Sequence, residues 1–496
     1  MAVRLSKSRI MSSLQCLKRV HLEVNRRDLV HFSKATEAAF ALGHEVGDIA
    51  IQLFGGTHGD NAGVFIDYRG GSFANALART QHLMTSMFRA PIYEATLQHD
   101  GVLVREDVLL PVDGDSWHIV EVKASTKLKP EHVNDCAVQA WVHTESGFSL
   151  DRISLAHINN QFVYRGDGNY DGLLIENDLT EQVFELMPTV PIWIEEASEA
   201  VSGPMPDVPV GQHCTSPYEC PFMDFCWPHD AQYPVSGLGG GKKKLGQWVS
   251  AGYRDIRDVP AGVITSETQQ RIHSVTRKGV AELLPGARIF VESLPYPRFY
   301  LDFETAGPAI PLWAGTRPYQ ALPFQWSCHI ERAPGEMEHA EFLDLSGEAP
   351  MRALAKQMIA DLETEGPVLM YTSYERDVIK GLIEMFPDLA ADLQAIIDRL
   401  VDLHPTTRAS YYHPDMHGSW SIKAVLPTIA PEMDYALLEG IAEGTEASGA
   451  YVEAIHPDTS VERKEEIRLN LLKYCKHDTE AMVRLVHFFE QAPQTN

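Results

Sequence analysis

Alternating hydrophobic and polar positions predict a pair of strands near residue 110. In GVLVREDVLLPVDGDSWHIVEVKAST, β-branched residues stand on either side of an Asp113-Gly114 step, at positions 102, 104 and 108 and at positions 119, 120 and 122. β-Branched residues favour strands, and Asp-Gly favours the tight turn of a hairpin. Because neighbouring side chains in a strand point to opposite faces, Glu121 and Lys123 are expected on the same face.

The same period of two recurs in RFYLDFET, where Asp302 and Glu304 fall on one face of a predicted strand. Further on, PVLMYTSYERDVIKGL reads as a buried strand that runs into a helix carrying Glu375. The segment LLKYCKHDTEAMVRLVHFF has the period of an amphipathic helix. Tyr474 and Asp478 are four residues apart in it and share a face.

Strand and helix patterns occur together along the whole chain of 496 residues, so an α/β protein is expected. Two mixed-sheet α/β domains are predicted, at residues 1–235 and 289–496. Between them, PVSGLGGGKKK reads as a flexible boundary followed by a small helical connector, so that residues 236–288 join the domains. The connector is similar to a helix-hairpin-helix that contacts phosphates, and a solvated helical spacer is an equal alternative.

Charge and composition narrow the class of protein. The net charge is −26 and hydrophobic residues make up 44%, which excludes a basic nucleic-acid coat protein and a largely disordered chain. Lys and Arg are nevertheless concentrated in residues 1–36 and 242–278, with eight in each. No apolar stretch approaches a membrane span or a secretory leader, and the seven cysteines do not indicate a disulfide framework. A cytoplasmic protein without membrane contact is expected.

The first candidate site is a carboxylate pair beside a lysine. Asp107 and Glu121 offer hard oxygen ligands for Mg²⁺ or Mn²⁺, and Lys123 can neutralise developing charge. This set resembles the PD-(D/E)XK nuclease core, and Gln139 with His143 resembles the Q-x-x-x-Y motif of its RecB-like branch. The resemblance implies a restriction-endonuclease-like fold with Asp107, Glu121, Lys123 and Gln139 as catalytic residues.

Further candidates lie upstream of this set. The histidine of the first RecB-like helix would fall on Gly47, and the neighbouring His44 and Glu45 are candidates to replace it. Glu94 is another candidate carboxylate, although a charge at a strand edge is the favoured interpretation.

The second candidate site consists of cysteines. Cys214, Cys220 and Cys226 have the spacing C-x5-C-x5-C, and Cys16 lies far away in LSKSRIMSSLQCLKRV. Regularly spaced thiols indicate either a [4Fe–4S] cluster or zinc, the latter with His213 or His229 as extra ligands. An early cysteine beside a late trio resembles the iron–sulfur RecB-type nucleases, which implies a structural [4Fe–4S] cluster.

The third candidate site combines the acids of the second domain. Asp302, Glu304 and two more acids suit phosphodiester hydrolysis with two metal ions, and a tyrosine one helical turn before the last acid can orient water. The set resembles the tyrosine subtype of the RNase H-like DEDD exonucleases. Asp302 and Glu304 match its first motif, Glu375 its second, and Tyr474 with Asp478 its third. Asp302, Glu304 and Asp478 are the expected metal ligands.

Two other residues of this domain are candidates for a functional role. Asp377 is a rival of Glu375 for the second motif. Lys423 is a candidate for a phosphate contact, with packing or loop structure as the favoured interpretation.

The whole chain resembles an uncharacterised bacterial group, domain of unknown function family 2779, that joins an iron–sulfur RecB-like module to an RNase H-like module. This resemblance implies a metal-dependent nuclease that acts on single-stranded DNA or DNA ends in repair, recombination or defence. The expected partners are nucleic acid, DNA before RNA, and a helicase or other repair or defence protein. Two alternatives are a single-activity DNA or RNA 3′–5′ exonuclease with one inactive lobe and a non-catalytic nucleic-acid-binding scaffold. Polarity, oligomeric state and pathway do not follow from the sequence.

Overall fold

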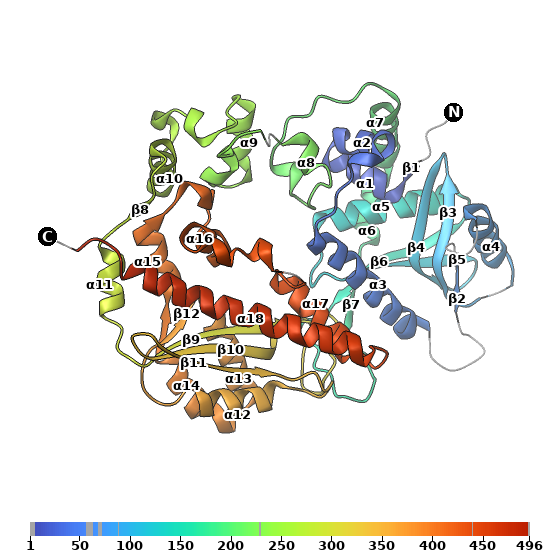
Figure 1. Cartoon of the computed structure of the whole chain (residues 1–496). Coiled ribbons are helices and arrows are strands. Elements are labelled where there is room, and N and C mark those ends of the chain that lie inside the picture. The colour runs from blue at the N-terminus through green and yellow to red at the C-terminus, as the bar shows by residue number, and fades with distance from the viewer. Residues whose placement is uncertain are drawn as a thin grey trace. The chain divides into compact units, whose positions relative to one another are not determined.

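The computed structural model describes residues 5–55, 63–67, 72–87, 89–227, 230–438 and 440–494. The chain divides into two compact units, shown in Figure 1. Unit 1 comprises Met1–Pro228 and Pro308–Tyr319, and unit 2 comprises His229–Gly307 and Gln320–Asn496. The segment predicted as linker and connector, 236–288, belongs to unit 2 in this division.

Unit 1 is built on one mixed sheet in the order β2-β3-β4-β5-β6-β7, with β1 paired to β4. Its strands are β1 (Leu5–Ser6), β2 (Val64–Phe65), β3 (Ile92–His99), β4 (Val102–Pro111), β5 (Ser116–Lys123), β6 (Ser149–Ile158) and β7 (Leu174–Asp178). The predicted hairpin is confirmed, since β4 and β5 pair antiparallel. Strands β5 and β6 are parallel and are connected through a helix, as parallel neighbours require.

Helices cover both faces of this sheet. They are α1 (Lys7–Gln15), α2 (Leu17–Asn25), α3 (Lys34–Gly55), α4 (Phe73–Thr85), α5 (Pro130–Glu145), α6 (Thr180–Leu186), α7 (Val190–Ser202) and α8 (Met223–Cys226). Ile119 packs in the cluster that contains the apolar residues of α5, whereas the next residue, Val120, packs against Ala50 of α3. The alternation of β5 therefore places Glu121 on the face that α5 covers.

A twelve-residue segment between two strands of unit 2, Pro308–Tyr319, packs on unit 1. Ala309 lies in a small apolar cluster with Val46 and Ile158. Tyr164 is bonded to the segment through the backbone, donating to the carbonyl of Thr316 at 3.0 Å. The segment thus completes the packing of unit 1 with residues that lie far away in the sequence.

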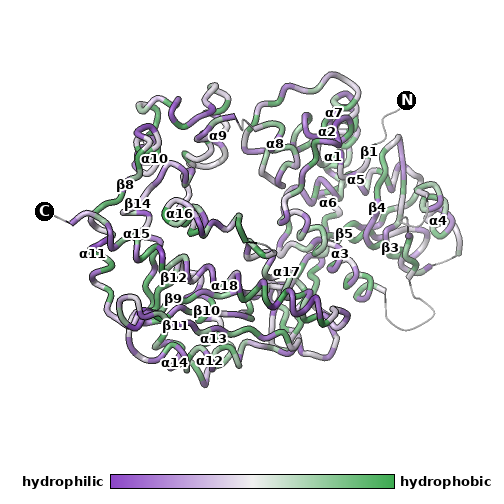
Figure 2. Tube along the Cα trace, viewed as in Figure 1, coloured by the Kyte–Doolittle hydropathy of each residue, from purple (hydrophilic) through white to green (hydrophobic). Residues whose placement is uncertain are grey.

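Unit 2 contains a five-stranded mixed sheet in the order β11-β10-β9-β12-β13 and a two-stranded sheet of β8 and β14. The strands are β8 (Glu282–Leu283), β9 (Arg298–Ala306), β10 (Leu322–Ala333), β11 (Glu336–Leu343), β12 (Val368–Met370), β13 (Leu400–Asp402) and β14 (Tyr411–Tyr412). Strand β9 is central, antiparallel to β10 and parallel to β12. Figure 2 shows hydrophobic residues along β9 and β10, in agreement with their burial.

The helices of unit 2 include those that cover the larger sheet and those of the connector. They are α9 (Lys242–Ser250), α10 (Glu267–Lys278), α11 (Gly286–Glu292), α12 (Met351–Asp361), α13 (Tyr374–Met385), α14 (Ala390–Ile397), α15 (Leu403–Ser410), α16 (Ile422–Ile429), α17 (Gly444–Ile455) and α18 (Val461–Phe489). In Figure 1, α18 runs along one side of the sheet, and α12, α13 and α14 lie on the other. The predicted class, a mixed α/β protein, is confirmed.

The connector contains two helices, α9 and α10, as its periodicity predicts. Ser266 is the N-cap residue of α10, and 3-10 turns at Ile256–Asp258 and Ala261–Val263 occupy the Pro/Gly-containing stretch between the helices. Within the described ranges of the chain, no helix combines the length and the hydrophobicity that a membrane span needs.

Candidate functional site

The hairpin of unit 1 brings the predicted carboxylates together. Asp107 lies on β4, and its Oδ2 accepts a hydrogen bond of 2.8 Å from the backbone N–H of Val122 on β5. Glu94 in the neighbouring strand β3 adopts a left-handed backbone conformation, with φ of 56°. Ile92 and Ala95 of β3 both pack in the cluster that contains the apolar residues of α5. They are an odd number of residues apart, so the alternation of faces along β3 shifts by one residue between them. Asp107 therefore lies where the strand pair is irregular.

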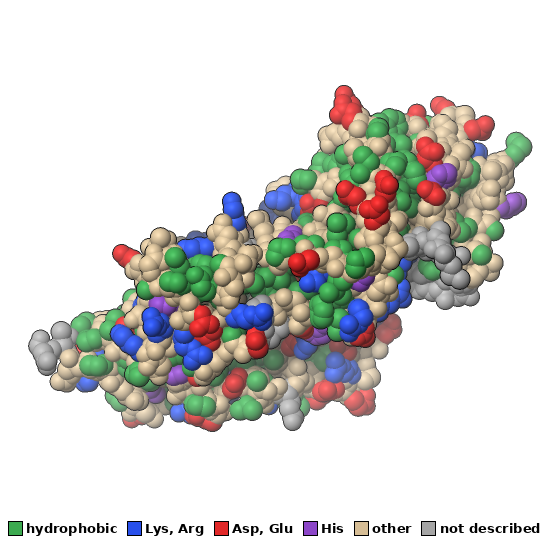
Figure 3. Space-filling model, turned by 90° about the horizontal axis from the view of Figure 1, so that it is seen from above, with side chains coloured by type: hydrophobic (Ala, Val, Ile, Leu, Met, Phe, Trp, Pro, Cys, Tyr) green, Lys and Arg blue, Asp and Glu red, His purple; other side chains and the backbone are tan. Residues whose placement is uncertain are grey.

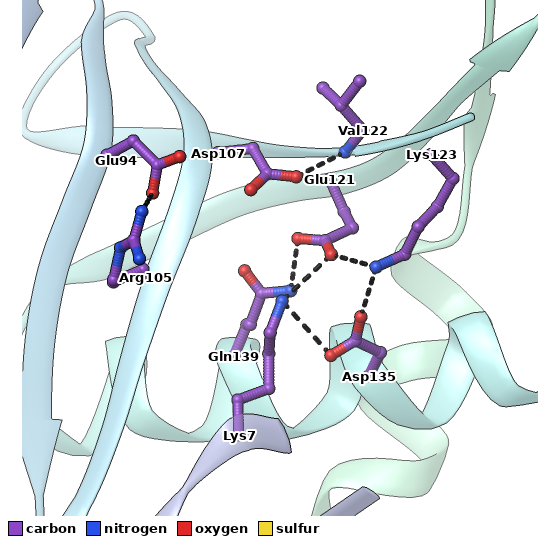
Figure 4. A network of polar contacts seen from close by, with 9 residues as sticks. All are labelled: Lys7, Glu94, Arg105, Asp107, Glu121, Val122, Lys123, Asp135 and Gln139. Atoms are coloured by element: carbon purple, nitrogen blue, oxygen red, sulfur yellow. Dashed lines mark hydrogen bonds and ion pairs between the residues drawn. The ribbon is translucent and has the colours of Figure 1, made fainter. Parts of the chain in front are cut away.

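Glu121 is the centre of a buried polar network, shown in Figure 4. Lys123 Nζ donates to Glu121 Oε1 at 2.5 Å and to Asp135 of α5 at 2.7 Å. Lys7, at the start of α1, donates to the same Glu121 oxygen at 2.9 Å and pairs with Asp135 at 3.2 Å. Gln139 Nε2 donates to the other oxygen of Glu121 at 2.7 Å. Two lysines and an amide thus engage both oxygens of one carboxylate.

The two carboxyl groups differ in their pKa values. Burial, together with the neighbouring Glu121, raises the pKa of Asp107 to about 7. Burial opposes the ionisation of Glu121 as well, but Lys123 and Lys7 hold the pKa of its carboxyl well below the usual range. The site therefore presents one ionised carboxylate beside one that titrates near neutrality.

Three other residues were predicted around this site, and one of them lies beside it. His143 Nδ1 is bonded to Glu106 Oε1 at 2.9 Å, and both side chains are fully buried, so His143 contacts a different acid from the Asp107–Glu121 pair. Glu94 forms an ion pair with Arg105 and lies close enough to Asp107 to raise the pKa of its carboxyl (Figure 4). His44 is exposed on α3.

The four predicted cysteines line one cavity of unit 1. Cys16 stands between α1 and α2, Cys214 and Cys220 lie in the loop after α7, and Cys226 ends α8. All four are free thiols. The N–H of Gly211 points at Cys214 Sγ over 3.4 Å, which is the kind of contact that a thiolate accepts. His213 also lines the cavity, whereas His229 lies outside the described residues.

The cysteines supply a donor set that suits either of the two expected cofactors. Both a [4Fe–4S] cluster and a zinc ion are held by thiolate ligands, and four thiols line this one cavity. His213 offers a further nitrogen ligand for zinc.

In unit 2 four carboxylates converge beside the central strand. Asp302 and Glu304 extend from β9, Glu375 from the first turn of α13 and Asp478 from α18. Ligand atoms of Asp302, Glu304 and Cys475 lie within 4.8 Å of one another. Glu375 is buried, and its Oε2 has no hydrogen-bond partner among the described residues. This unsatisfied oxygen and the hard donors around it fit one or more divalent cations.

Burial raises the pKa of each of these four carboxyl groups, and the charges of neighbouring acids raise it further for Asp302, Glu304 and Glu375. Burial and the charge of Asp478 raise the pKa values of Asp302 and Glu304 well above the usual range. Burial is also the main cause that raises the pKa of Glu375 to about 8 and that of Asp478 to about 6. Full ionisation of the cluster at neutral pH therefore requires compensating positive charge.

Two tyrosines and a lysine complete this site. The hydroxyl group of Tyr435 donates to Asp478 Oδ1, and Tyr474 lies close enough to the same carboxylate to lower its pKa. Lys423 Nζ lies 5.1 Å and 5.3 Å from the ring centroids of Tyr435 and Tyr474. Its charge lowers the pKa of both Glu304 and Asp478 against the effect of burial. Lys423 thus belongs to the acid site rather than to a remote loop.

The structure separates the two candidates for the second acid motif. Asp377 is exposed and lies 3.5 Å from Lys380 on the surface of α13. Glu375 is buried, and it lies close enough to Asp302 and Asp478 for these acids to affect the pKa of its carboxyl. Glu375 is therefore the residue that faces the other three acids.

Three residues of these sites were not singled out by the sequence patterns. Asp135 lies one turn before Gln139 on α5, and this i, i+4 spacing is a signal that could have identified it. Lys7 and Tyr435 have no such signal, because each reaches its site from a segment remote from the motif residues.

Comparisons with known proteins give one family match and one weak structural likeness. No curated relative matches the chain. A solved structure titled "Crystal structure of SSO0001" is similar over 45% of this chain and 84% of its own, with 14% identity and a TM-score of 0.24. The model of an uncharacterised family, domain of unknown function DUF2779, matches residues 299–421. The sequence predicted a resemblance to this family over nearly the whole chain, whereas the family model matches a shorter stretch. That stretch contains Asp302, Glu304 and Glu375. It ends before Lys423 and Asp478.

Proposed function

We propose that this protein is a metal-dependent nuclease that hydrolyses phosphodiester bonds in single-stranded DNA or at DNA ends, with RNA as a less favoured substrate. The observation that carries the proposal is the convergence of Asp302, Glu304, Glu375 and Asp478 at one place in unit 2. Buried acids that raise one another's pKa values are costly unless cations bind them. A mixed sheet with the first acid pair on its central strand also supports an RNase H-like, DEDD-type assignment.

In unit 2, Asp302, Glu304 and Asp478 would hold the cations, with Glu375 as a further oxygen ligand. Bound Mg²⁺ or Mn²⁺ supplies Lewis-acid activation of a water and stabilises charge on the leaving oxygen. Tyr474 is one helical turn from Asp478, so its hydroxyl can orient a water beside the same carboxylate. Lys423 supplies a fixed positive charge near Glu304 and Asp478, where negative charge accumulates.

In unit 1, Asp107 and Glu121 would hold a cation and Lys123 would stabilise charge, as in the PD-(D/E)XK resemblance. The donor atoms are present, but Glu121 already accepts from Lys7, Lys123 and Gln139. Because Glu121 already accepts these three hydrogen bonds, a second candidate function is favoured, in which unit 1 binds nucleic acid and unit 2 alone cleaves it. The four cysteines would hold a [4Fe–4S] cluster that ties the N-terminal helices to the loop after α7.

The test uses full-length protein purified without oxygen and end-labelled single-stranded DNA and RNA, with Mn²⁺ or with EDTA. The wild type is compared with Asp107→Asn, Asp302→Asn and Asp377→Asn, where the last is a matched control on the exposed side of α13. We expect Mn²⁺-dependent products from the wild type and from the control, and loss of products with Asp302→Asn.

The response of Asp107→Asn decides between the two candidates. Loss of a separate set of products would assign cleavage to both units, and unchanged products would assign it to unit 2 alone. If every protein leaves every substrate intact in Mn²⁺, the nuclease proposal is wrong and a nucleic-acid-binding scaffold becomes the better hypothesis.

A further inference from the structure

A second polar feature of unit 2 lies outside the acid cluster. A pocket of about 430 Å³ is lined by residues of α10 and α15 and by Trp420. Its volume is within the range of small-ligand sites. The side chains that line it include Arg271, Arg408 and His404 and no carboxylate. A cationic pocket is unexpected in a chain with a net charge of −26, so its composition points to an anionic ligand.

The two arginines are only partly neutralised by the protein. Arg271 Nε is bonded to Glu282 at 2.5 Å and its Nη1 to the carbonyl of Arg408, while its Nη2 is buried without a partner among the described residues. Arg408 is exposed and stacks at 5.6 Å on the ring of Trp420, and none of its described contacts is with a carboxylate. Guanidinium groups with free donors are suited to phosphate oxygens.

A short chain of contacts connects this pocket to the acid cluster. Asp402 lies close enough to Glu375 to raise the pKa of its carboxyl. The same Asp402 accepts a hydrogen bond from the backbone N–H of His404 at 2.9 Å, as the N-cap residue of α15. His404 and Arg408 are one helical turn apart and both line the pocket. The pocket therefore flanks the acids on the side of α13 and α15.

We propose that this pocket binds a backbone phosphate of the nucleic-acid strand whose scissile bond lies at the carboxylate cluster. The proposal rests on the proposed nuclease function and names a substrate contact for it. Figure 3 shows Lys and Arg side chains gathered on the side where Figure 1 draws α9 and α10, the helices of the basic connector. Arg271 belongs to α10, so the connector supplies one wall of the phosphate site.

The experiment measures binding separately from cleavage. Fluorescence anisotropy of a labelled single-stranded oligonucleotide is recorded in EDTA with the full-length wild type, Arg408→Gln, Arg408→Lys and Arg484→Gln. Arg484 is a matched control, exposed on α18 and paired with Glu480. We expect Arg408→Gln to weaken binding about tenfold and to reduce the slope of log affinity against log salt by about 0.7, the value for one phosphate contact on a single strand. Arg408→Lys should retain most of the affinity.

The outcomes separate this proposal from the nuclease proposal. If Arg408→Gln binds the oligonucleotide and responds to salt as Arg484→Gln does, the proposal of a phosphate site in this pocket is wrong, even if Mn²⁺-dependent cleavage is intact. If binding depends on Arg408 but no variant cleaves, the pocket stands and the nuclease proposal is contradicted. Inorganic phosphate and a nucleoside monophosphate are added as competitors. If either competitor binds at a site that depends on Arg408 while Arg408→Gln leaves strand binding unchanged, the pocket is a small-anion site and the proposal is wrong.

Discussion

Lys7 donates from Nζ to Oε1 of Glu121 over 2.9 Å, although 114 residues separate the two in the sequence. The contact joins the first turn of α1 to the central part of the unit 1 sheet. Lys123 binds the same oxygen from the same strand, so Glu121 remains ionised in spite of its burial. The N-terminal segment is therefore part of this site and not an appendage to it.

Replacing Lys7 by methionine should destabilise the protein by about 3 kcal/mol, because it leaves part of a buried carboxylate charge uncompensated. The free energy of unfolding is measured by urea denaturation of the full chain. Lys127→Met is the matched control in unit 1, because Lys127 is exposed, and its effect should stay within about 0.5 kcal/mol. The double variant with Glu121→Gln should lose less than the sum of the single variants. Additive losses would show that the two side chains do not interact.

The local patterns of the sequence predicted the elements and faces of both sites. Asp302 and Glu304 share a face of β9, and Glu121 and Lys123 share a face of β5, because a strand has a period of two. Lys7 and Tyr435 escaped prediction because their partners are fixed by tertiary packing. The packing of Pro308–Tyr319 on unit 1 was not foreseen for the same reason. The convergence of Cys16 with the late trio followed from resemblance, since no spacing rule connects residues so far apart.

The acid cluster of unit 2 should make the metal-free protein less stable as the pH rises. The pKa of Glu375 is raised from 4.5 to about 8, so the folded protein keeps a proton that the unfolded chain releases. Stability from this proton is present below the unfolded value and is lost as the pH rises through the folded value. For Glu375 the effect is on the order of 5 kcal/mol across that window.

Thermal unfolding in EDTA at several pH values between about 5 and 8 checks this expectation. Glu375→Gln removes the titrating group and should lose less stability with rising pH than the wild type does. Asp377→Asn, on the exposed side of the same helix, should follow the wild type. Mn²⁺ should reduce the loss at high pH, since a cation compensates the ionised acids. An unchanged pH slope in Glu375→Gln would contradict the coupling inferred for the cluster.

Removal of the positive charge of Lys423 should weaken cation binding indirectly. Without this charge the pKa values of Glu304 and Asp478 rise further, so fewer ionised ligands are present at neutral pH. We expect Lys423→Met to need about tenfold more Mn²⁺ for half-saturation, which corresponds to about one pKa unit of lost stabilisation.

Electron paramagnetic resonance of free Mn²⁺ measures that affinity without any substrate. Lys423→Arg keeps the charge and should recover most of the affinity, and Lys380→Met, an exposed lysine near Asp377, is the control. If Lys423→Met and the wild type bind Mn²⁺ equally, Lys423 acts on the substrate or on packing rather than on the carboxylates.

The cysteines that line the cavity of unit 1 allow a prediction of the metal content of the purified protein, independent of its activity. Protein purified without oxygen should contain iron and acid-labile sulfide and little zinc, because four thiols line one cavity and the cysteine pattern resembles that of the iron–sulfur RecB-type nucleases. Cys16→Ala should abolish the bound iron, since Cys16 is the ligand that the N-terminal helices bring to the cavity. Cys136→Ala is the matched control, because Cys136 is buried in the core of the same unit and does not line the cavity. Stoichiometric zinc without iron in the wild type would contradict the iron–sulfur cluster, and iron retained in Cys16→Ala would exclude Cys16 from the ligand set.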